Sequence, residues 1–338
     1  MPIYACVEGG GTTFVVALAK DDPTNVVERE EFPTTTPKET IGKCVDWLKA
    51  RHYDALGIAT FGPVELHPER KYFGYITTTP KPGWQYADVL GPLKAIRNVP
   101  FMFDTDVNAP AVAEHAYLTA EAVKNGQAPA TSCCYITVGT GIGVGLVING
   151  TAVHGLMHPE GGHLAVPRHP SDAASNFAGN NPKDCFGGLC AENMACSGSL
   201  AARAGLESTA GLAGLADDHP VWEVAAHYLG ALCANIVLLA SPERIIISGG
   251  VMQRASLFPK VRREMQRHLN GYIQDDALTT PAGVSHFVAP STWGNSAGMV
   301  GALTLAKTAL EAKKTDVSKY YLPMLLAAGT VAVMLAVR

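Results

Sequence analysis

Two glycine turns in the sequence each lie between short apolar runs that are rich in β-branched residues. Residues 3–7 and 14–19 flank the first turn, and residues 135–138 and 144–148 flank the second. Each pair of runs predicts a β-hairpin. Because this pattern occurs once in each half of the chain, it predicts two related domains with a cleft between them.

Elsewhere the apolar positions alternate between helical and strand spacing, which is typical of α/β proteins. The predicted helices are 38–50, the segment from Val107 onward, 221–240 and 295–313. The predicted strands are 56–60, 101–104 and 244–248, the last of which leads into Gly249 and Gly250. The segment 172–184 is polar and rich in Asn, Ala and Gly, so we expect a surface loop there.

The two glycine turns are candidate phosphate sites. Glycine permits positive φ and close backbone approach, so the turn amides can point inward and bind an anion. A Walker loop or a dinucleotide fingerprint would need a helix directly after the glycines, whereas a strand is predicted here. One such turn is usually an ordinary hairpin, but the pair indicates ATP. The candidate nucleotide-binding residues are Gly10, Gly11, Thr12 and Thr13 in the first turn and Gly139, Thr140, Gly141 and Gly143 in the second.

The composition favours a soluble enzyme of two domains. The chain has 338 residues and is 47% hydrophobic, enough for two cores at roughly 150 residues per domain. Its net charge of −4, with no basic stripe, argues against a nucleic-acid partner. The first predicted strand begins at Ile3, which leaves no room for a signal peptide, and the eight cysteines suit a reducing compartment. We therefore expect a cytoplasmic body.

The C-terminal segment 320–337 differs from the rest because its eighteen residues carry no charge. Lys319 and Arg338 bracket it. Its length lies at the lower edge of the ~17–25 residues that cross a bilayer. One interpretation is a transmembrane tail that anchors a cytoplasmic enzyme to an intracellular membrane through the tether 314–319. The other is a helix that docks on the enzyme body.

Asp106 is the candidate catalytic base. It follows the predicted strand 101–104 and comes directly before the predicted helix. The N-terminus of that helix favours the ionised carboxylate, which suits a group that accepts a proton from a substrate hydroxyl during phosphoryl transfer. The alternative is that Thr105 or Asp106 only caps the helix.

His163, Cys185 and Cys190 form a candidate zinc set. A His followed some twenty residues later by two cysteines five apart offers three of the four ligands of a structural zinc. The alternative is that these side chains bind no metal. Candidates for the fourth ligand are Cys196, His169, His158, His154 or water.

Taken together, these motifs resemble the ROK family of repressors, uncharacterised reading frames and sugar kinases, and its fructokinase branch in particular. The resemblance covers about residues 3–313. That branch opens with Glu-Ala-Gly-Gly-Thr-Lys where this chain has Glu-Gly-Gly-Gly-Thr-Thr at 8–13. The other matching blocks are 61–64, 79–84, 105–109, 139–143, 158–163 and 248–251. Seven blocks in this order are not expected by chance.

The resemblance implies an α/β protein with the two-domain, actin-like ATPase (ribonuclease H-like) fold and a cleft between the domains. An N-terminal domain, 1–115, would be completed by the helix 295–313. A C-terminal domain, 116–294, would carry the zinc and sugar loop. The tether and the hydrophobic helix at the C-terminus would lie outside both domains.

The resemblance also implies roles for particular residues. Asp106 would be the base, ATP with Mg²⁺ would bind the glycine turns, and Gly249 and Gly250 would lie against the adenosine. The partners would be a hexose and, as a homodimer, a second copy of the chain. The residues that would contact the sugar are Thr105, Glu160, His163, Glu192, Gly62 and Pro63.

Two positions depart from the family pattern. Thr13 stands where the family has Lys, so one positive contact with the nucleotide is missing or supplied elsewhere. Relatives carry Cys-x-x-His-x-x-Cys, whereas here Gly187 and Gly188 lie between Cys185 and Cys190. One zinc ligand is therefore lost, and we still expect zinc.

Three functions fit these observations. The first is phosphorylation of D-fructose to fructose 6-phosphate by ATP. The second keeps the chemistry and makes the protein a glucokinase, a mannokinase or an N-acetylhexosamine kinase. The third is a non-catalytic, sugar-responsive regulator or binding protein, against which the retained Asp106 and the missing DNA-binding module both weigh.

Overall fold

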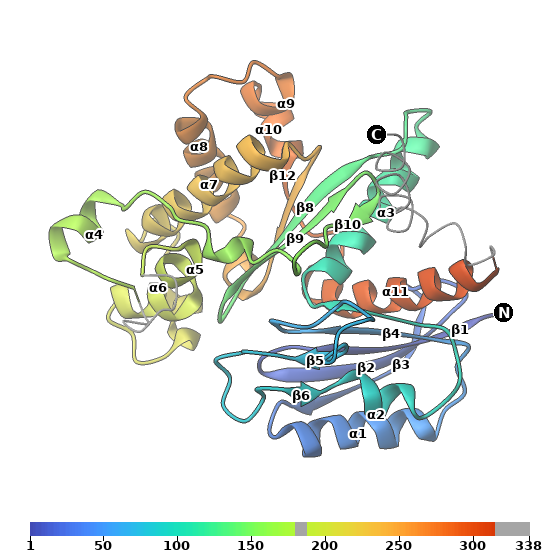
Figure 1. Ribbon diagram of the computed structural model, residues 1–338. Helices are drawn as coiled ribbons and strands as arrows, with labels where there is room; N and C mark the ends of the chain where they lie inside the picture. The colour runs from blue at the N-terminus through green and yellow to red at the C-terminus, as the bar shows by residue number, and fades with distance from the viewer. Residues whose placement is uncertain (180–187, 315–338) are drawn as a thin grey trace, which may run out of the picture.

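Two five-stranded sheets form the framework of the computed structural model, which describes residues 1–179 and 188–314 (Figure 1). The first sheet has the order β3-β2-β1-β4-β7. Its first three strands are antiparallel, and β4 and β7 run parallel to β1. The strands are β1 (Ile3–Gly9), β2 (Thr13–Lys20), β3 (Val26–Pro33), β4 (Ala55–Thr60) and β7 (Phe101–Thr105).

The second sheet repeats this arrangement in the order β10-β9-β8-β11-β12. Strands β8 and β9 form an antiparallel hairpin, and β11 and β12 run parallel to β8. The strands are β8 (Ser132–Val138), β9 (Ile142–Ile148), β10 (Thr151–Ala152), β11 (Ile245–Ser248) and β12 (Val288–Pro290). Both predicted hairpins and their repetition in the two halves of the chain are therefore confirmed.

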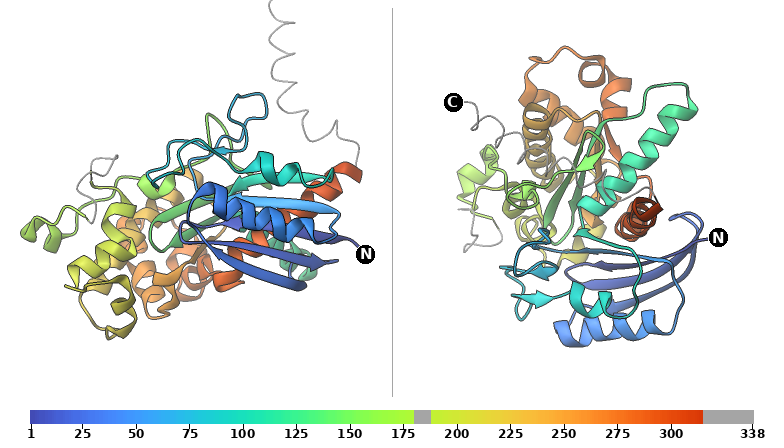
Figure 2. Two further views of the ribbon diagram at one scale, coloured as in Figure 1. Left: turned by 90° about the horizontal axis from the view of Figure 1, so that it is seen from below. Right: turned by 45° about the vertical axis from the view of Figure 1, so that its right-hand side comes forward.

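Helices cover both faces of the first sheet (Figure 2, right). Helix α1 (Pro37–Lys49) begins where Thr36 accepts a hydrogen bond from the Glu39 amide, and Trp47 and Leu48 bury its apolar side. Helix α2 (Leu90–Lys94) and the small sheet of β5 (Tyr75–Ile76) and β6 (Ala87–Asp88) extend this layer. The opposite face is covered by α11 (Ala297–Lys314).

Two helices cross between the sheets and join the lobes. Helix α3 (Asn108–Lys124) leaves the first sheet after β7 and packs on β8 and β9 of the second. Helix α11 leaves the second lobe and packs on β1 and β4, where a Cβ at Gly57 would lie 1.8 Å from the Ala302 carbonyl oxygen. The glycine therefore permits the close approach of α11. The predicted boundary at residue 115 falls inside α3, and the division into domains there stays a prediction.

The other face of the second sheet is covered by α7 (Val221–Ala240), against which α8 (Leu257–Leu269) packs. Within residues 1–179 and 188–314, α7 alone is long and apolar enough to cross a membrane, but 72% of that apolar stretch is buried inside the protein. It is a core helix. The remaining helical elements of this lobe are η1 (Gly161–His163), α4 (Pro170–Ser175), α5 (Ala191–Ala195), α6 (Ser197–Arg203), η2 (Thr209–Gly214), η3 (Gly250–Gln253), α9 (Asp276–Thr279), α10 (Pro281–Phe287) and η4 (Gly294–Ser296).

The helices and strands predicted from the sequence are confirmed to within a few residues at their ends. The predicted loop 172–184 is wrong in its first part, because α4 extends to Ser175 and Asp172 is buried. The periodicity of so short a helix is not visible in the sequence. The predicted hydrophobic helix 320–337 and the tether beyond Lys314 lie outside the described residues.

Candidate active site

The candidate catalytic residues gather at one edge of each sheet. The first glycine turn follows β1 and the second follows β8, and in each turn the first glycine amide donates across the turn, from Gly10 to Thr13 at 2.9 Å and from Gly139 to Gly141 at 2.8 Å. Strands that run parallel to β1 and β8 end at these same edges, which is where ligands bind in open α/β sheets. Asp106 therefore lies at the edge that carries the first turn.

A buried polar network fixes the junction before Asp106. The carboxylate of Asp104 accepts hydrogen bonds from the Thr105 amide at 2.7 Å and from the Asn108 side chain at 2.9 Å. His154, from the second lobe, lies 2.9 Å from the other oxygen of this carboxylate. Burial lowers the pKa of His154, but the hydrogen bond and charge of Asp104 outweigh burial and raise it. The contact between His154 and Asp104 joins the two lobes beside the candidate base.

The N-cap residue of α3 is Val107, and of Thr105 and Asp106 it is Thr105 whose side chain bonds to the first turn of the helix. The Thr105 hydroxyl accepts a hydrogen bond from the Asn108 amide at 2.9 Å. The Asp106 amide donates to the Thr60 carbonyl at 3.0 Å and so ties the residue to the end of β4. The geometry fits a base role for Asp106, and that role remains a prediction.

Acidic side chains concentrate around Asp106. Burial raises the pKa of Asp106 to about 7. Burial, with the charges of Glu192 and Asp106, raises the pKa of Glu160 to about 7. Burial and the charges of Asp106 and Glu31 raise the pKa of Glu8, at the end of β1, to about 8. A base with a pKa near neutrality is suited to proton transfer at that pH.

Glu192 connects the second glycine turn to the candidate sugar residues. Its carboxylate accepts a hydrogen bond from the Ile142 amide at 2.8 Å, and a Cβ at Gly141 would lie 2.6 Å from the same oxygen. The Nε2 atom of His163 lies 3.9 Å from the other oxygen. Only glycine at position 141 allows the carboxylate this close to the turn.

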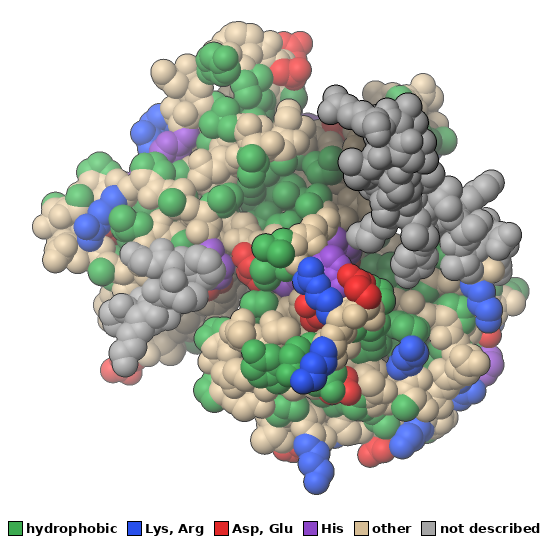
Figure 3. All heavy atoms as spheres, in the orientation of Figure 1, with side chains coloured by type: hydrophobic (Ala, Val, Ile, Leu, Met, Phe, Trp, Pro, Cys, Tyr) green, Lys and Arg blue, Asp and Glu red, His purple; other side chains and the backbone are tan. Residues whose placement is uncertain are grey.

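The segment after β4 contacts the second lobe through His158. The Val64 amide donates to Nε2 of His158 at 3.0 Å, and a Cβ at Gly62 would lie 3.2 Å from the same ring. Nearby, Arg70 donates to the Leu156 carbonyl at 3.1 Å. Figure 3 shows acidic, basic and histidine side chains together over the seam between the lobes. The predicted sugar residues Gly62 and Pro63 therefore lie beside the segment that leads to Glu160.

Two of the three candidate zinc ligands lie next to each other. The Nδ1 atom of His163 is 3.5 Å from Sγ of Cys190. Tetrahedral zinc with bonds of ~2.3 Å to sulfur and ~2.05 Å to nitrogen would place these atoms about 3.5 Å apart, so the pair fits such an ion. Cys185 lies outside the described residues.

The candidates for the fourth zinc ligand make other contacts. His154 pairs with Asp104, and His158 accepts from Val64. His169 Nδ1 lies 2.7 Å from the Ser171 hydroxyl, and the Cys196 thiol contacts Ser199. Among the residues described, His163 and Cys190 are thus the candidate ligands brought together.

A cavity of about 750 Å³ opens between the second glycine turn and η3. It is lined by Gly139, Thr140 and Gly250, and the adenosine contact of Gly249 and Gly250 stays a prediction. Gly249 has a φ of 97°, and a Cβ there would lie 2.4 Å from the Val138 carbonyl oxygen. The chain can turn away from β11 at this point only because residue 249 is glycine.

Lys81 is a candidate residue whose role the sequence did not reveal. Its Nζ donates a hydrogen bond to the Gly11 carbonyl at 2.6 Å, which places a positive charge on the first glycine turn. Trp84 holds this loop in place. It is buried, its ring stacks on Phe14 with the ring centroids 5.4 Å apart, and its indole N–H donates to the Thr35 carbonyl. A signal was present, since Lys81 belongs to the matching block 79–84.

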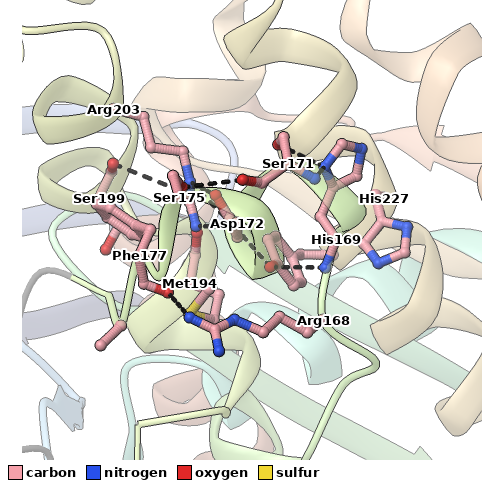
Figure 4. Close-up of polar contacts among 12 residues, drawn as sticks. Arg168, His169, Ser171, Asp172, Ser175, Phe177, Met194, Ser199, Arg203 and His227 are labelled. Carbon is pink, nitrogen blue, oxygen red and sulfur yellow. Dashed lines mark hydrogen bonds and ion pairs between the residues drawn. The ribbon is translucent and has the colours of Figure 1, made fainter.

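The α4 segment is held by a buried ion pair that the sequence also did not reveal (Figure 4). Arg203 on α6 donates to both carboxylate oxygens of Asp172, and the Tyr228 hydroxyl donates to one of them at 2.6 Å. Burial raises the pKa of Asp172, but these hydrogen bonds outweigh burial and lower it. The network anchors the chain that follows Glu160 and His163.

The repeated sheets, paired glycine turns and carboxylate-lined seam define a two-lobed α/β fold of the sugar-kinase class. The model of the ROK family matches residues 4–309, and the chain belongs to this family. It is similar to the fructokinase of Pediococcus pentosaceus, with 36% identity over 309 residues that cover 91% of this chain and 99% of the relative. It is also similar to the fructokinase of Lactococcus lactis subsp. cremoris, at 35% identity over 90% of this chain and 96% of the relative.

The fold agrees with that of solved members of the family. The crystal structure of the ROK hexokinase from Thermus thermophilus matches with a TM-score of 0.69 and 22% identity. The match covers 92% of this chain and 99% of that one. At this identity the likeness establishes the fold, and the roles of individual residues rest on the geometry above.

Proposed function

We propose that the protein transfers the γ-phosphoryl group of ATP to the 6-hydroxyl of D-fructose. The observation that carries this proposal is the placement of Asp106, whose pKa is about 7, at the edge of the first sheet and beside the acidic group of Glu160 and Glu192. The choice of fructose is supported by the similarity to two fructokinases over nine-tenths of the chain.

In the proposed reaction, Asp106 accepts the hydroxyl proton as the sugar oxygen attacks the γ-phosphorus and ADP leaves. Amides of the two glycine turns other than those of Gly10 and Gly139, which donate across the turns, would hold the phosphates together with Lys81. Mg²⁺ bound with ATP would offset the negative charge on the phosphates. Closure of the lobes over the sugar would exclude water as a competing acceptor.

A panel of hexoses tests the substrate. Purified protein is assayed with ATP and fructose, glucose, mannose or N-acetylmannosamine by coupling ADP formation to NADH oxidation. We expect the highest kcat/KM with fructose. A clear preference for another sugar would support a kinase with a different substrate. Sugar binding without phosphorylation of any of the four would favour a non-catalytic, sugar-responsive regulator.

We also propose that His163 and Cys190, with Cys185, hold a zinc ion that stiffens the sugar loop. Support comes from the 3.5 Å separation of the His163 and Cys190 donor atoms. The purified wild-type protein is then expected to retain close to one more zinc per chain than Cys190→Ser does. Active wild-type protein without bound zinc would contradict this.

We further propose that 320–337 anchors a cytoplasmic enzyme to an intracellular membrane. An eighteen-residue helix rises about 27 Å, close to the ~30 Å hydrocarbon core. The full chain should sediment with membranes and resist carbonate extraction, and a chain that ends at Asp316 should stay in the supernatant with unchanged kcat. A soluble full chain would contradict anchoring. The homodimer stays a prediction, which light scattering after size-exclusion chromatography measures.

A further inference from the structure

A second group of potential metal ligands lies between α7 and α8. His227 comes from α7, and Glu264 and His268 come from α8, four residues apart and hence on one face of that helix. One donor atom from each residue lies within 4.8 Å of the others. They line a cavity of about 520 Å³. Figure 3 shows histidine and basic side chains together over α8.

The ring orientation of His227 is set by the backbone. Its Nε2 lies 2.7 Å from the Pro167 carbonyl oxygen, so Nε2 carries the hydrogen and donates it. This leaves the lone pair on Nδ1. The Nδ1 atom lies 2.9 Å from Nη2 of Arg267 and 3.7 Å from Oε2 of Glu264. Metal-binding histidines are commonly oriented in this way, by a hydrogen bond from the other ring nitrogen to a carbonyl.

The guanidinium group of Arg267 occupies the point on which the donor atoms converge. Its Nη2 lies 2.9 Å from Nδ1 of His227 and 3.2 Å from Nε2 of His268, and its Nε lies 2.8 Å from the Glu264 carboxylate. Both imidazoles and the carboxylate thus face one positive charge. The Arg267 side chain is 55% exposed, so it can swing into water without losing a buried position.

Glu264 is the carboxylate of this cavity that becomes available as a ligand once Arg267 moves away. The other carboxylate of the cavity, Glu223, pairs with Lys260 and with Arg263. Glu264 pairs with Arg267 at 2.8 Å and lies 3.9 Å from Arg263. Release of Arg267 would therefore leave Glu264 as the carboxylate that faces the two imidazoles.

We propose that His227, Glu264 and His268 bind a divalent transition metal of the zinc class in exchange for Arg267. Two imidazoles and one carboxylate form a ligand set that suits zinc, with water as the fourth ligand. The ligand atoms of tetrahedral zinc lie about 3.3–3.5 Å apart, so the three side chains must close by at most about 1.5 Å. The bound ion would link α7 to α8. The site is separate from His163 and Cys190 and does not depend on the proposed kinase activity.

Metal titration of four proteins tests the proposal. Wild-type protein, His268→Ala, Arg267→Ala and Cys190→Ser are stripped with a chelator and titrated with Zn²⁺ by calorimetry. His268→Ala should lose the α7–α8 equivalent, with affinity falling ~10-fold or more, as expected when a metal site is damaged. Arg267→Ala should bind that equivalent more tightly, because the competing cation is gone. Cys190→Ser should retain it.

Two further measurements make the result decisive. Added Zn²⁺ should raise the Tm of Cys190→Ser and leave that of the double variant Cys190→Ser, His268→Ala unchanged, and the exposed His52→Ala serves as the matched control. If His268→Ala fails to fold, the gain in affinity of Arg267→Ala carries the test. The proposal would be overturned if Cys190→Ser bound no zinc at all. It would also be overturned if Arg267→Ala bound zinc with the affinity of the wild type.

Discussion

The two glycine turns occupy equivalent positions in the two sheets, but their surroundings differ. A Cβ at Gly11 in the first turn would meet nothing within 4 Å, whereas one at Gly141 in the second would lie 2.6 Å from the Glu192 carboxylate. A Cβ at Gly143 would lie 2.5 Å from Val107. Gly11 in the first turn therefore faces open space, whereas Gly141 and Gly143 in the second are packed against other side chains.

This difference shows that glycine serves two physical purposes in one repeated motif. In the first turn it leaves space for a ligand, and the positive charge comes from Lys81 on another loop. In the second turn it lets a carboxylate approach the backbone, so that the turn and the sugar loop hold each other in place. Both turns are thus expected to affect ATP binding, and the second, through Glu192, to affect fructose binding as well.

The largest expected effect comes from replacing Asp106. The proposed reaction needs this base even when both glycine turns bind their ligands normally. Asp106→Asn should fold and still bind ATP and fructose, yet lose ~10²-fold or more in kcat, because a general base contributes about that much. The measurements are steady-state kinetics and calorimetric binding of both substrates. Turnover close to that of the wild type would remove Asp106 from the mechanism and leave the turns as the whole site.

The pH dependence gives an independent test of the same base. The pKa of Asp106 is raised to about 7, so the reactive carboxylate is lost as the pH falls through that value. The kcat/KM of the wild type should therefore decline below about pH 7. Glu160 also titrates near 7, so the profile reports the pair rather than either group alone. A flat profile between pH 5 and 8, measured at constant ionic strength, would argue against a carboxylate base.

The second-largest expected effect distinguishes the roles of the two glycine turns directly. Gly141→Ala should force Glu192 away from the Ile142 amide, lower stability by about 1 kcal/mol, the net contribution of one hydrogen bond, and raise the KM for fructose. Gly11→Ala is the matched control, because its Cβ meets open space; it should keep the wild-type Tm and change chiefly the KM for ATP. Denaturant unfolding and kinetics on both variants measure this. Equal losses of stability would show that the turns are packed alike.

The sequence predicts the parts of this architecture that depend on local pattern. Both hairpins follow from short apolar runs that flank a glycine turn, and α7 follows from a long apolar run. Contacts between distant residues have no such pattern. Lys81 and Gly11 are 70 positions apart, and Tyr228 and Asp172 are 56 apart. Such pairs become visible only when folding brings the segments together.

The same contrast between local patterns and distant contacts applies to the candidate site. Asp106 was predictable because a carboxylate between a strand and a helix is a local signal. The network of Asp104, Asn108 and His154 was not, since His154 comes from the other lobe. The error at 172–184 has a related cause, because Asp172 is polar in sequence but is buried against Arg203 and Tyr228, which are distant in sequence. Local polarity predicts exposure, and a distant partner can reverse it.

The smallest expected effect concerns the charge on the open turn. Lys81→Ala should raise the KM for ATP by ~10-fold, the scale of one charge-assisted hydrogen bond, with little change in the KM for fructose. The family places a lysine where this chain has Thr13, so Thr13→Lys combined with Lys81→Ala should recover much of the lost affinity for ATP. Lys71→Ala, which removes a lysine that lies over the ring of Tyr72, is the control for loss of charge alone. If Lys81→Ala leaves the KM for ATP unchanged, the lysine only braces the Gly11 carbonyl, and the first turn binds phosphate through its amides without help from the neighbouring loop.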